Sequence, residues 1–110
     1  MAAIERKSFD SPDDEIKLPH GRMRVVLVED ESVWRSELAP GWTWDEDMKP
    51  LAGGAASCPM THREYVVSGR IRYHSDDGTE VTGEPGDYLF IRPGHTGEVL
   101  GDDVCVLVDW

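Results

Sequence analysis

The chain has 110 residues and a mass of 12.3 kDa, a size that suits one domain with a single hydrophobic core. Its 22 acidic and 11 basic residues give a net charge of −11, so phosphate backbones and anionic membranes would repel it. We therefore expect neither a nucleic-acid partner nor a membrane partner.

The sequence predicts a cytoplasmic protein. No apolar run approaches the roughly 20 residues of a membrane span, and the opening "MAAIERKSFD" lacks the apolar core of a signal peptide. Because a reducing compartment disfavours disulfides, Cys58 and Cys105 are expected to be free thiols. Cys105 in "VCVLV" is interpreted as a small buried hydrophobe. Cys58 follows "AGGAAS", and its neighbours are not apolar enough to explain it as core.

Residues 1–19 are polar and charge-rich and predict an N-terminal arm or an edge strand. Residues 20–110 predict a single domain. Within it, "RMRVVLVED" and "SVWRSEL" are rich in β-branched residues and predict short strands, and "APG" is a turn signal. The following "GWTWDED" places Trp42 and Trp44 two residues apart, hence on one face of any strand.

From Thr61 onward, short alternating segments are separated by Gly, Pro and Asp. The segments "HREYVVSG", "RIRYHS", "TEVTG", "DYLFIRPG", "EVLG" and "VCVLVDW" recur about every ten residues, a spacing typical of an all-β sandwich or barrel. The Asp77-Gly78 pair predicts a type I′ hairpin turn. No apolar stripe with the helical period extends beyond two turns, so the sequence favours an all-β fold over an α/β fold.

Two blocks, "HREYVVSGRIRYHSDDGTE" and "EPGDYLFIRPGHTGEVLGDDVCVLVDW", resemble the two short motifs that flank a metal site in the cupins. The resemblance covers about Trp34 to Trp110 and implies an all-β double-stranded β-helix, the cupin or jelly-roll barrel. The segments "PGWTW", "KPLAG", "SC" and "YVVSGR" are similar to those of small single-domain bacterial cupins common in actinobacteria. The resemblance also implies a homodimer, in which the N-terminal arm is a candidate for strand exchange.

Carried over residue by residue, the cupin motifs imply a metal site at Cys58, His62 and His95. Counting back from Gly69 places His62 at the usual glutamate ligand and Cys58 near the second histidine of the usual pair. Counting back from Gly101 places His95 at the histidine of the second motif. The first histidine of the pair is missing, so the set departs from the usual three histidines and one glutamate.

The residues themselves make chemical sense as a site. Residues four apart in an extended chain share a face, so Cys58 and His62 are expected to point into one cavity, and Glu64 with them. One thiolate and two imidazoles suit a divalent transition metal, with zinc favoured and nickel, copper or iron as other candidates. Three protein ligands leave the open position of a catalytic site. Glu64 is then the expected general base.

Trp42 and Trp44 are candidates for the wall of a ligand-binding cavity, with core packing or a dimer interface as the alternative interpretation. Together these features favour a small metal-dependent cupin that acts on a small organic molecule by isomerase, epimerase or cyclase chemistry. The alternative is a non-catalytic ligand-binding or regulatory module without metal, indicated by the missing histidine and the acidic composition.

Two further interpretations of the same residues stay open. Cys58 is a candidate nucleophile with His62 as its base, although no acyl-transfer signature surrounds the thiol. Without any site, Cys58 would be an inert thiol, His62 a core histidine with one hydrogen bond, and His95 a turn residue.

Overall fold

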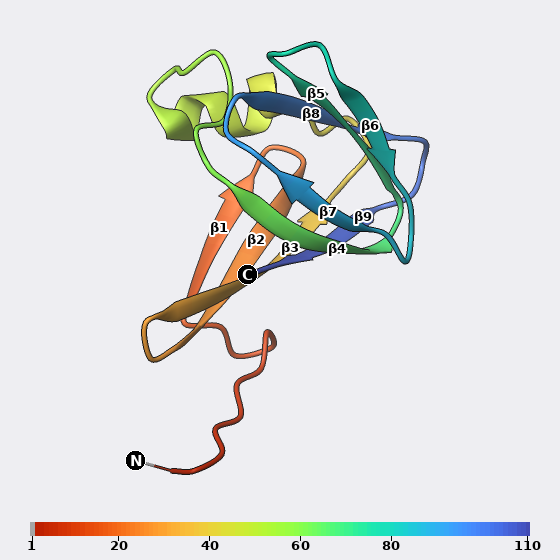
Figure 1. The fold of residues 1–110 in the computed structure, drawn as a ribbon. Helices are drawn as coiled ribbons and strands as arrows, with labels where there is room; N and C mark the ends of the chain where they lie inside the picture. The colour runs from red at the N-terminus through yellow and green to blue at the C-terminus, as the bar shows by residue number, and fades with distance from the viewer. Residues whose placement is uncertain (1) are drawn as a thin grey trace.

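The computed structural model describes residues 2–110. This part of the chain contains nine strands and two short helical segments (Figure 1). The strands are β1 (Asp14–Leu18), β2 (Gly21–Val28), β3 (Glu31–Leu38), β4 (His62–Ser68), β5 (Arg70–Ser75), β6 (Glu80–Gly83), β7 (Tyr88–Ile91), β8 (His95–Leu100) and β9 (Cys105–Asp109). The helical segments are η1 (Trp44–Met48) and η2 (Lys49–Ala52). Neither is long and apolar enough to cross a bilayer, nor is any other helix within residues 2–110.

The strands form two antiparallel sheets, which confirms the all-β prediction. The larger sheet has the order β1-β2-β3-β9-β4-β7, and the smaller one has the order β6-β5-β8. Strand β9 pairs with both β3 and β4, so the end of the chain joins β3 to the first motif strand, β4. Strand β1 lies at one edge of the larger sheet. Phe9 and Asp13 before it are hydrogen-bonded to β2, and the chain ahead of them extends away from both sheets (Figure 1).

The apolar core comes from the alternation that the sequence shows. Along β4, Glu64 and Val66 are buried whereas Arg63, Tyr65 and Val67 are exposed. The inward side chains of the strands meet in one cluster. Its buried members are Leu38, Trp42, Trp44, Cys58, Val66, Ile71, Cys105 and Leu107. The cluster includes Cys58, so the expectation that this thiol lies outside the core is wrong.

Gly69 makes a tight connection between β4 and β5. Its φ is +72°, and a Cβ there would lie 2.6 Å from Cys105 Cα and 2.7 Å from the Val104 carbonyl oxygen. Backbone atoms cannot approach a Cβ so closely, and only glycine adopts this φ without strain. The connection therefore packs directly against the start of β9.

The turn between β5 and β6 differs from the predicted type I′ turn. That turn needs a positive φ at both central residues, but here Gly78 has one and Asp77 does not. The Gly78 N–H donates to the Ser75 carbonyl at 2.9 Å, and the Ser75 N–H donates to the Thr79 carbonyl at 2.8 Å. The Asp77 carboxylate accepts from the Thr79 N–H at 2.9 Å. This side-chain bond favours a longer loop of another type.

Trp42 and Trp44 do not share a strand, because Trp44 begins η1. The Thr43 hydroxyl accepts a hydrogen bond from the Glu46 N–H at 3.1 Å and caps the segment. The pattern Thr-x-x-Glu is the capping-box signature, and three acidic residues follow in the first turn. The segment from Trp44 is therefore helical and not extended as predicted, because the Thr43 cap favours the start of a helix.

The buried carboxylate of Asp47 fixes η1 against the first hairpin. It accepts the backbone N–H of His20 at 2.7 Å, and its other oxygen lies 3.0 Å from His20 Nδ1. Because Asp47 and Trp44 belong to the same short segment, this contact also sets the position of Trp44 beside the core.

Candidate functional site

A cavity of about 360 Å³ adjoins the core and contains the residues of the predicted site. Its lining includes all four tryptophans of the chain, Trp34, Trp42, Trp44 and Trp110. The groups in it with acid–base or metal-binding chemistry are Cys58, His62, Glu64, Tyr73, His95 and Asp109. The cavity therefore combines an aromatic wall with a cluster of titratable groups.

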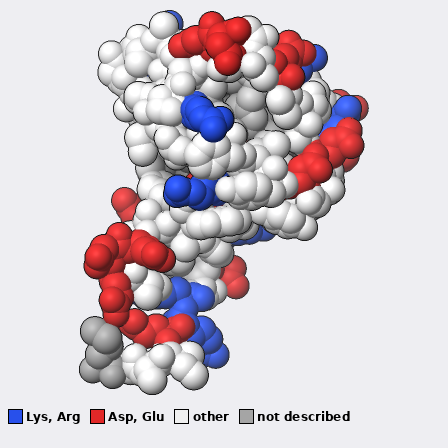
Figure 2. Space-filling model, viewed as in Figure 1, with Lys and Arg blue, Asp and Glu red and all other residues white. Residues whose placement is uncertain are grey.

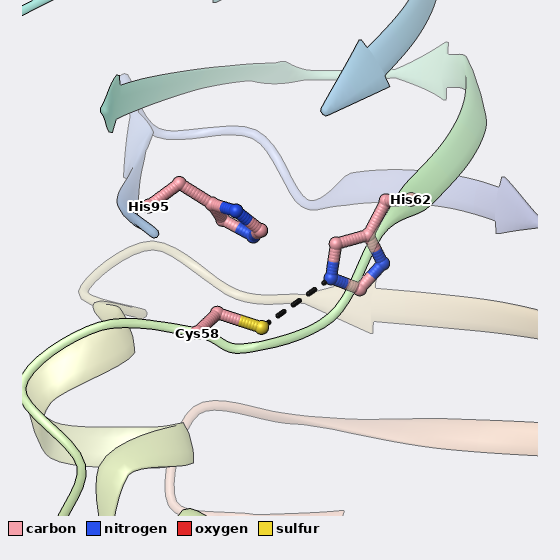
Figure 3. A group of neighbouring side chains, drawn as sticks. All are labelled: Cys58, His62 and His95. Atoms are coloured by element: carbon pink, nitrogen blue, oxygen red, sulfur yellow. Dashed lines mark hydrogen bonds between the residues drawn. The ribbon is translucent and has the colours of Figure 1, made fainter. Parts of the chain in front are cut away.

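Cys58, His62 and His95 point toward one another although they come from three separate segments (Figure 3). One ligand atom of each lies within 4.8 Å of the other two. His62 begins β4, His95 begins β8, and Cys58 lies in the loop after η2. The Cys58 N–H donates to the His95 carbonyl at 2.7 Å, and the Gly94 N–H donates to the Cys58 carbonyl at 2.8 Å. These bonds attach the loop to β8.

The second nitrogen of each imidazole is held by an oxygen. His62 Nδ1 lies 2.6 Å from Asp109 Oδ2, and His95 Nδ1 lies 2.8 Å from the Arg92 carbonyl oxygen. An imidazole that donates from Nδ1 presents the lone pair of Nε2, and metal-binding histidines are commonly held in this way. Both rings are therefore oriented as metal ligands would be.

The distances also suit a tetrahedral ion. His62 Nε2 lies 3.5 Å from Cys58 Sγ. Zinc bonds of about 2.3 Å to sulfur and about 2.0–2.1 Å to nitrogen place two such ligands about 3.6 Å apart at the tetrahedral angle. The donor set of one thiolate and two imidazoles therefore fits zinc, with a fourth position open to a substrate or water.

Cys58 and His62 each change the pKa of the other. Burial raises the pKa of the Cys58 thiol, but hydrogen bonds from His62, His95 and the Met60 N–H outweigh burial and lower the pKa to about 6. Burial lowers the pKa of His62, but Asp109 and Cys58 outweigh burial and raise it to about 10. Both shifts favour a thiolate–imidazolium pair when no metal ion is bound, and an ion at this position would replace the proton on His62 Nε2. The thiolate is the form of cysteine that binds metal or attacks an electrophile.

Glu64 lies on the same face of β4 as His62 and is buried. Burial raises the pKa of this carboxyl to about 7, although a hydrogen bond from Tyr73 and the charge of His62 partly offset it. The Tyr73 hydroxyl donates to Glu64 Oε1 at 2.5 Å. Burial and the neighbouring Glu64 raise the pKa of Tyr73 well above its usual value. Tyr73 therefore keeps its proton while Glu64 can exchange one near neutral pH.

Two residues of this cluster, Tyr73 and Asp109, are not among the site residues predicted from the sequence. Alternation could have found both of them. Tyr73 lies two residues after the buried Ile71 of β5, and Asp109 lies two residues after the buried Leu107 of β9. Both side chains are therefore expected on the inward face.

The two tryptophans proposed for ligand binding are both buried and both line the cavity. Trp44 reaches it from η1 and Trp42 from the segment before it. Trp34 of β3 joins them, with its indole N–H donating to Ser32 Oγ at 3.2 Å. The structure thus places the predicted aromatic residues and the predicted metal ligands around one space.

No protein-family model matches the sequence, and no curated protein matches it significantly. Several solved structures have the same fold. A variant of the oxalate decarboxylase OxdC from Bacillus subtilis is 16% identical, with 99% of this chain and 30% of that chain covered and a TM-score of 0.66. The polyketide cyclase RemF from Streptomyces resistomycificus is 18% identical, with 96% and 77% covered and a TM-score of 0.66.

A protein of unknown function (DUF1255) from Acidithiobacillus ferrooxidans is 20% identical. The match covers 88% of this chain and 86% of that protein, with a TM-score of 0.59. These structures are cupins. The two antiparallel sheets of this chain therefore have the double-stranded β-helix fold of the cupins, as the sequence motifs predicted.

Proposed function

We propose that this protein is a small metal-dependent enzyme that acts on a small organic molecule. The observation that carries the proposal is the convergence of the Cys58 thiolate with Nε2 of His62 and His95 beside an aromatic cavity. Zinc is the favoured ion because it is bound by sulfur and nitrogen in tetrahedral sites, and nickel, copper and iron are the other candidates. We also propose that the protein is one of the small single-domain cupins common in actinobacteria, which its sequence motifs resemble.

When bound, such an ion supplies a Lewis acid that polarises a carbonyl or carboxylate oxygen. Glu64 supplies the acid–base chemistry, since a carboxyl with a pKa of about 7 both accepts and donates protons at neutral pH. It removes a proton from a carbon beside the carbonyl and returns that proton to the product. Isomerisation and epimerisation need only such proton transfers. In a cyclisation the carbanion would instead add to a second carbonyl carbon of the same molecule, and the oxygen of that carbonyl would take up the proton, so neither reaction class needs an oxidant or reductant.

Two neighbours position these groups. Tyr73 donates to one oxygen of Glu64, and no residue within 2–110 donates a hydrogen bond to the other oxygen. That second oxygen is the one we assign to the substrate proton. Asp109 accepts from His62 Nδ1 and thereby keeps Nε2 directed toward Cys58.

Metal content tests the proposal directly. We expect about one transition-metal ion per chain in untagged protein dialysed without strong chelator, measured by plasma mass spectrometry. The Cys58→Ala and His62→Ala variants should lose it. Cys105→Ala is the matched control, because it removes a buried thiol that is not among the three candidate ligands Cys58, His62 and His95. Absence of metal from wild-type protein, or equal content in all four proteins, would refute the metal centre.

A second candidate function is acyl transfer by Cys58. The chain of contacts from Cys58 to His62 to Asp109 has the order of nucleophile, base and orienting carboxylate. In this reaction Sγ attacks an ester carbonyl, the alcohol leaves with a proton from His62, and water then hydrolyses the thioester. With 4-nitrophenyl acetate and metal-stripped protein, a nitrophenolate burst lost in Cys58→Ser would support this candidate. Absence of a burst would exclude it.

The non-catalytic ligand-binding module is favoured by a different observation, the large apolar share of the cavity lining. It predicts tight binding of an organic ligand with neither metal nor turnover. Stoichiometric metal in the purified protein would count against it.

We also propose that the protein is a cytoplasmic homodimer. The outer face of β4 and β7 exposes Tyr65, Tyr88 and Phe90. Arg63 and Arg92 pack over the Phe90 ring on this face. In Figure 2 basic groups interrupt an otherwise uncharged surface, whereas acidic side chains gather at its margins and along the N-terminal arm. Burial of such a face against a second copy would remove apolar surface from water. A monomer in sedimentation at micromolar concentration would refute the dimer.

A further inference from the structure

Three arginines line one groove on the larger sheet. The groove has a volume of about 470 Å³, and its lining consists of Ser8, Phe9, Asp10, Arg22, Arg24, Arg35 and Glu37. Residues 8–10 of the N-terminal arm form one wall, and strands β2 and β3 form the other. The chain has 22 acidic and 11 basic residues, yet here three arginines face two carboxylates. The groove is therefore basic in an acidic protein.

The groove lies on the opposite face of the sheet from the cavity. Met23 of β2 and Ser36 of β3 are paired in register, and both line the cavity. Successive residues of a strand point to opposite faces. Arg24 and Arg35, the next pair in the same register, therefore point away from the cavity. A ligand in the groove is separated from the proposed metal centre by the thickness of the sheet.

Arg24 has no close counter-charge. Its side chain is only 15% exposed, and its guanidinium donates to the carbonyl oxygen of Phe9, a neutral group, at 3.0 Å. Among residues 2–110, the carboxylate within ion-pair distance is that of Asp10, at 3.9 Å, and the Asp10 side chain is 96% exposed. Water screens such a pair strongly. Asp10 therefore balances little of the charge of Arg24.

The register of β2 and β3 places a second cation beside Arg24. Arg24 lies directly opposite Arg35, and like charges in directly opposite positions destabilise a sheet. The Glu37 carboxylate accepts from Arg35 and also from Arg22 Nε at 3.0 Å. One carboxylate thus serves two guanidinium groups. An anion from solution would relieve the remaining repulsion between Arg24 and Arg35.

The exposed arginines can reach such an anion. The side chains of Arg22 and Arg35 are 39% and 32% exposed. A guanidinium carries five N–H donors, and Arg35 uses one of them on Glu37. The monoester of phosphoric acid carries nearly two negative charges near neutral pH and three acceptor oxygens, which arginine recognises well. A phosphate group therefore suits three clustered cations better than a carboxylate with its single charge.

We propose that this groove binds the phosphate group of a small phosphorylated metabolite. Arg35 and Arg22 donate hydrogen bonds to the phosphate, and the more covered Arg24 contributes its charge. The Asp10 carboxylate competes with the phosphate for Arg24. This site goes beyond the proposed function, because the groove and the cavity share no lining residue. Its ligand is an effector and not the substrate.

The test uses methyl phosphate and acetate, two anions with one methyl group each. Each is titrated into nitrogen-15-labelled protein at about pH 8, where the phosphate monoester is a dianion. The protein is first dialysed against EDTA, and sodium chloride keeps the ionic strength constant. The amide signals of residues 8–10 report on the groove, and the tryptophan indole signals report on the cavity. We expect methyl phosphate to give saturable shifts in the groove alone, and acetate to bind more weakly.

Loss of a donor should weaken binding. Arg35→Gln should raise the Kd for methyl phosphate about tenfold or more, because it removes charge-assisted hydrogen bonds. Arg70→Gln is the matched control. It makes the same change in net charge at an exposed position of β5, in the other sheet, and should leave the Kd unchanged.

Loss of the competing carboxylate should strengthen binding. Asp10→Asn should lower the Kd about two- to fivefold, the usual size of an exposed ion pair. Asp103→Asn, in the exposed loop before β9, is its control and should leave the Kd unchanged. The Asp10 side chain is almost fully exposed, so this variant should fold normally. It keeps the test decisive even if Arg35→Gln folds poorly.

Several results would overturn the inference. They are the absence of saturable shifts at residues 8–10, binding of acetate as tight as that of methyl phosphate, equal losses in Arg35→Gln and Arg70→Gln, and an unchanged Kd in Asp10→Asn. Shifts confined to the indole signals would place the phosphate in the cavity and would also refute the groove. Because EDTA removes any bound ion, none of these outcomes depends on the proposed metal centre.

Discussion

Cys58 and Cys105 are both buried in the same apolar cluster, yet their surroundings give them opposite chemistry. Burial, with a contribution from the charge of Glu64, raises the pKa of Cys105 to about 12. Burial acts on Cys58 in the same direction, but two histidines and a backbone N–H lower its pKa to about 6. Burial alone therefore makes a thiol inert, and hydrogen-bond donors within reach make it reactive.

The backbone around the two thiols differs as well. Beside Cys105, the connection at Gly69 leaves no space for a Cβ. In the segment before Cys58, Gly53 and Gly54 also have positive φ, but a Cβ at either position would meet nothing within 4 Å. The inert thiol thus lies in a tightly packed part of the core, and the reactive thiol follows a loosely packed loop.

The largest expected effect is on alkylation. In metal-stripped protein at pH 7, iodoacetamide should modify Cys58 at least about a hundredfold faster than Cys105, because the thiolate is the reactive form and Cys105 has no exposed surface. Peptide mass spectrometry over time gives both rates. In Cys58→Ala only the slow alkylation of Cys105 remains. Unfolded protein is the reference, because both thiols are then equally accessible to iodoacetamide. Equal rates in the folded protein would remove the distinction between the two thiols.

The packing difference should appear in stability. Gly69→Ala should lower the free energy of unfolding by about 3 kcal/mol or more, since it adds a backbone clash to an unfavourable φ. Gly53→Ala has a similar φ of +67° in open space and should cost about 1 kcal/mol. Urea titrations of both variants measure the two values. Similar losses would mean that φ, and not the close contact with β9, determines the cost.

The buried carboxyl of Glu64, whose charge acts on Cys105, should make the free energy of unfolding depend on pH. The pKa of Glu64 rises from an ordinary value of 4.5 to about 7 in the folded protein. Between these values the folded state binds more protons at Glu64 than the unfolded state does, so its contribution to stability falls as pH rises. Relative to Glu64→Gln, wild-type protein should lose at most about 3 kcal/mol from pH 4.5 to pH 7.

Urea titrations across this range provide the measurement for Glu64. Glu84→Gln is the control, because it makes the same substitution at an exposed position. A profile of Glu64→Gln parallel to that of wild-type protein would show that Glu64 does not titrate in this interval.

The smallest expected effect is on zinc affinity, through Asp109. This residue lies on β9 with Cys105, but its carboxylate contacts His62, the neighbour of Cys58. Asp109→Asn should weaken zinc affinity about tenfold, because it removes the charge that holds His62 Nδ1. Competition with a chromogenic chelator gives the affinity. Asp103→Asn, in the exposed loop before β9, is the control. An affinity unchanged by Asp109→Asn would restrict the site to the three direct ligands.

Local patterns in the sequence were sufficient for the strands and for much of the site. Alternation predicts the inward face of β4, and the same rule applied to "RIRYHS" and "VCVLVDW" would have added Tyr73 and Asp109. The Thr43 capping box was also available as a signal for η1. The positions of Tyr73, Asp109 and η1 thus follow from local patterns that the sequence itself contains.

Other features depend on contacts that no local pattern specifies. His62 meets Asp109 across 47 residues of sequence, and the pairing is fixed by the register of β4 against β9. Cys58 is buried although its neighbours in sequence are not apolar, because backbone bonds attach its loop to β8. Burial of this thiol is therefore a tertiary property, which alternation and composition cannot predict.

Two backbone hydrogen bonds join the Cys58 loop to the start of β8, and they determine how much of the centre is ordered before a metal ion binds. Cys58 and His95 are held as neighbours by the main chain and do not need an ion to bring them together. Most of the ordering entropy of the centre is thus lost when the chain folds and not when the ion enters. Such a preorganised centre would exchange its ion without unfolding, and its apo form would remain a native, cooperatively folded protein.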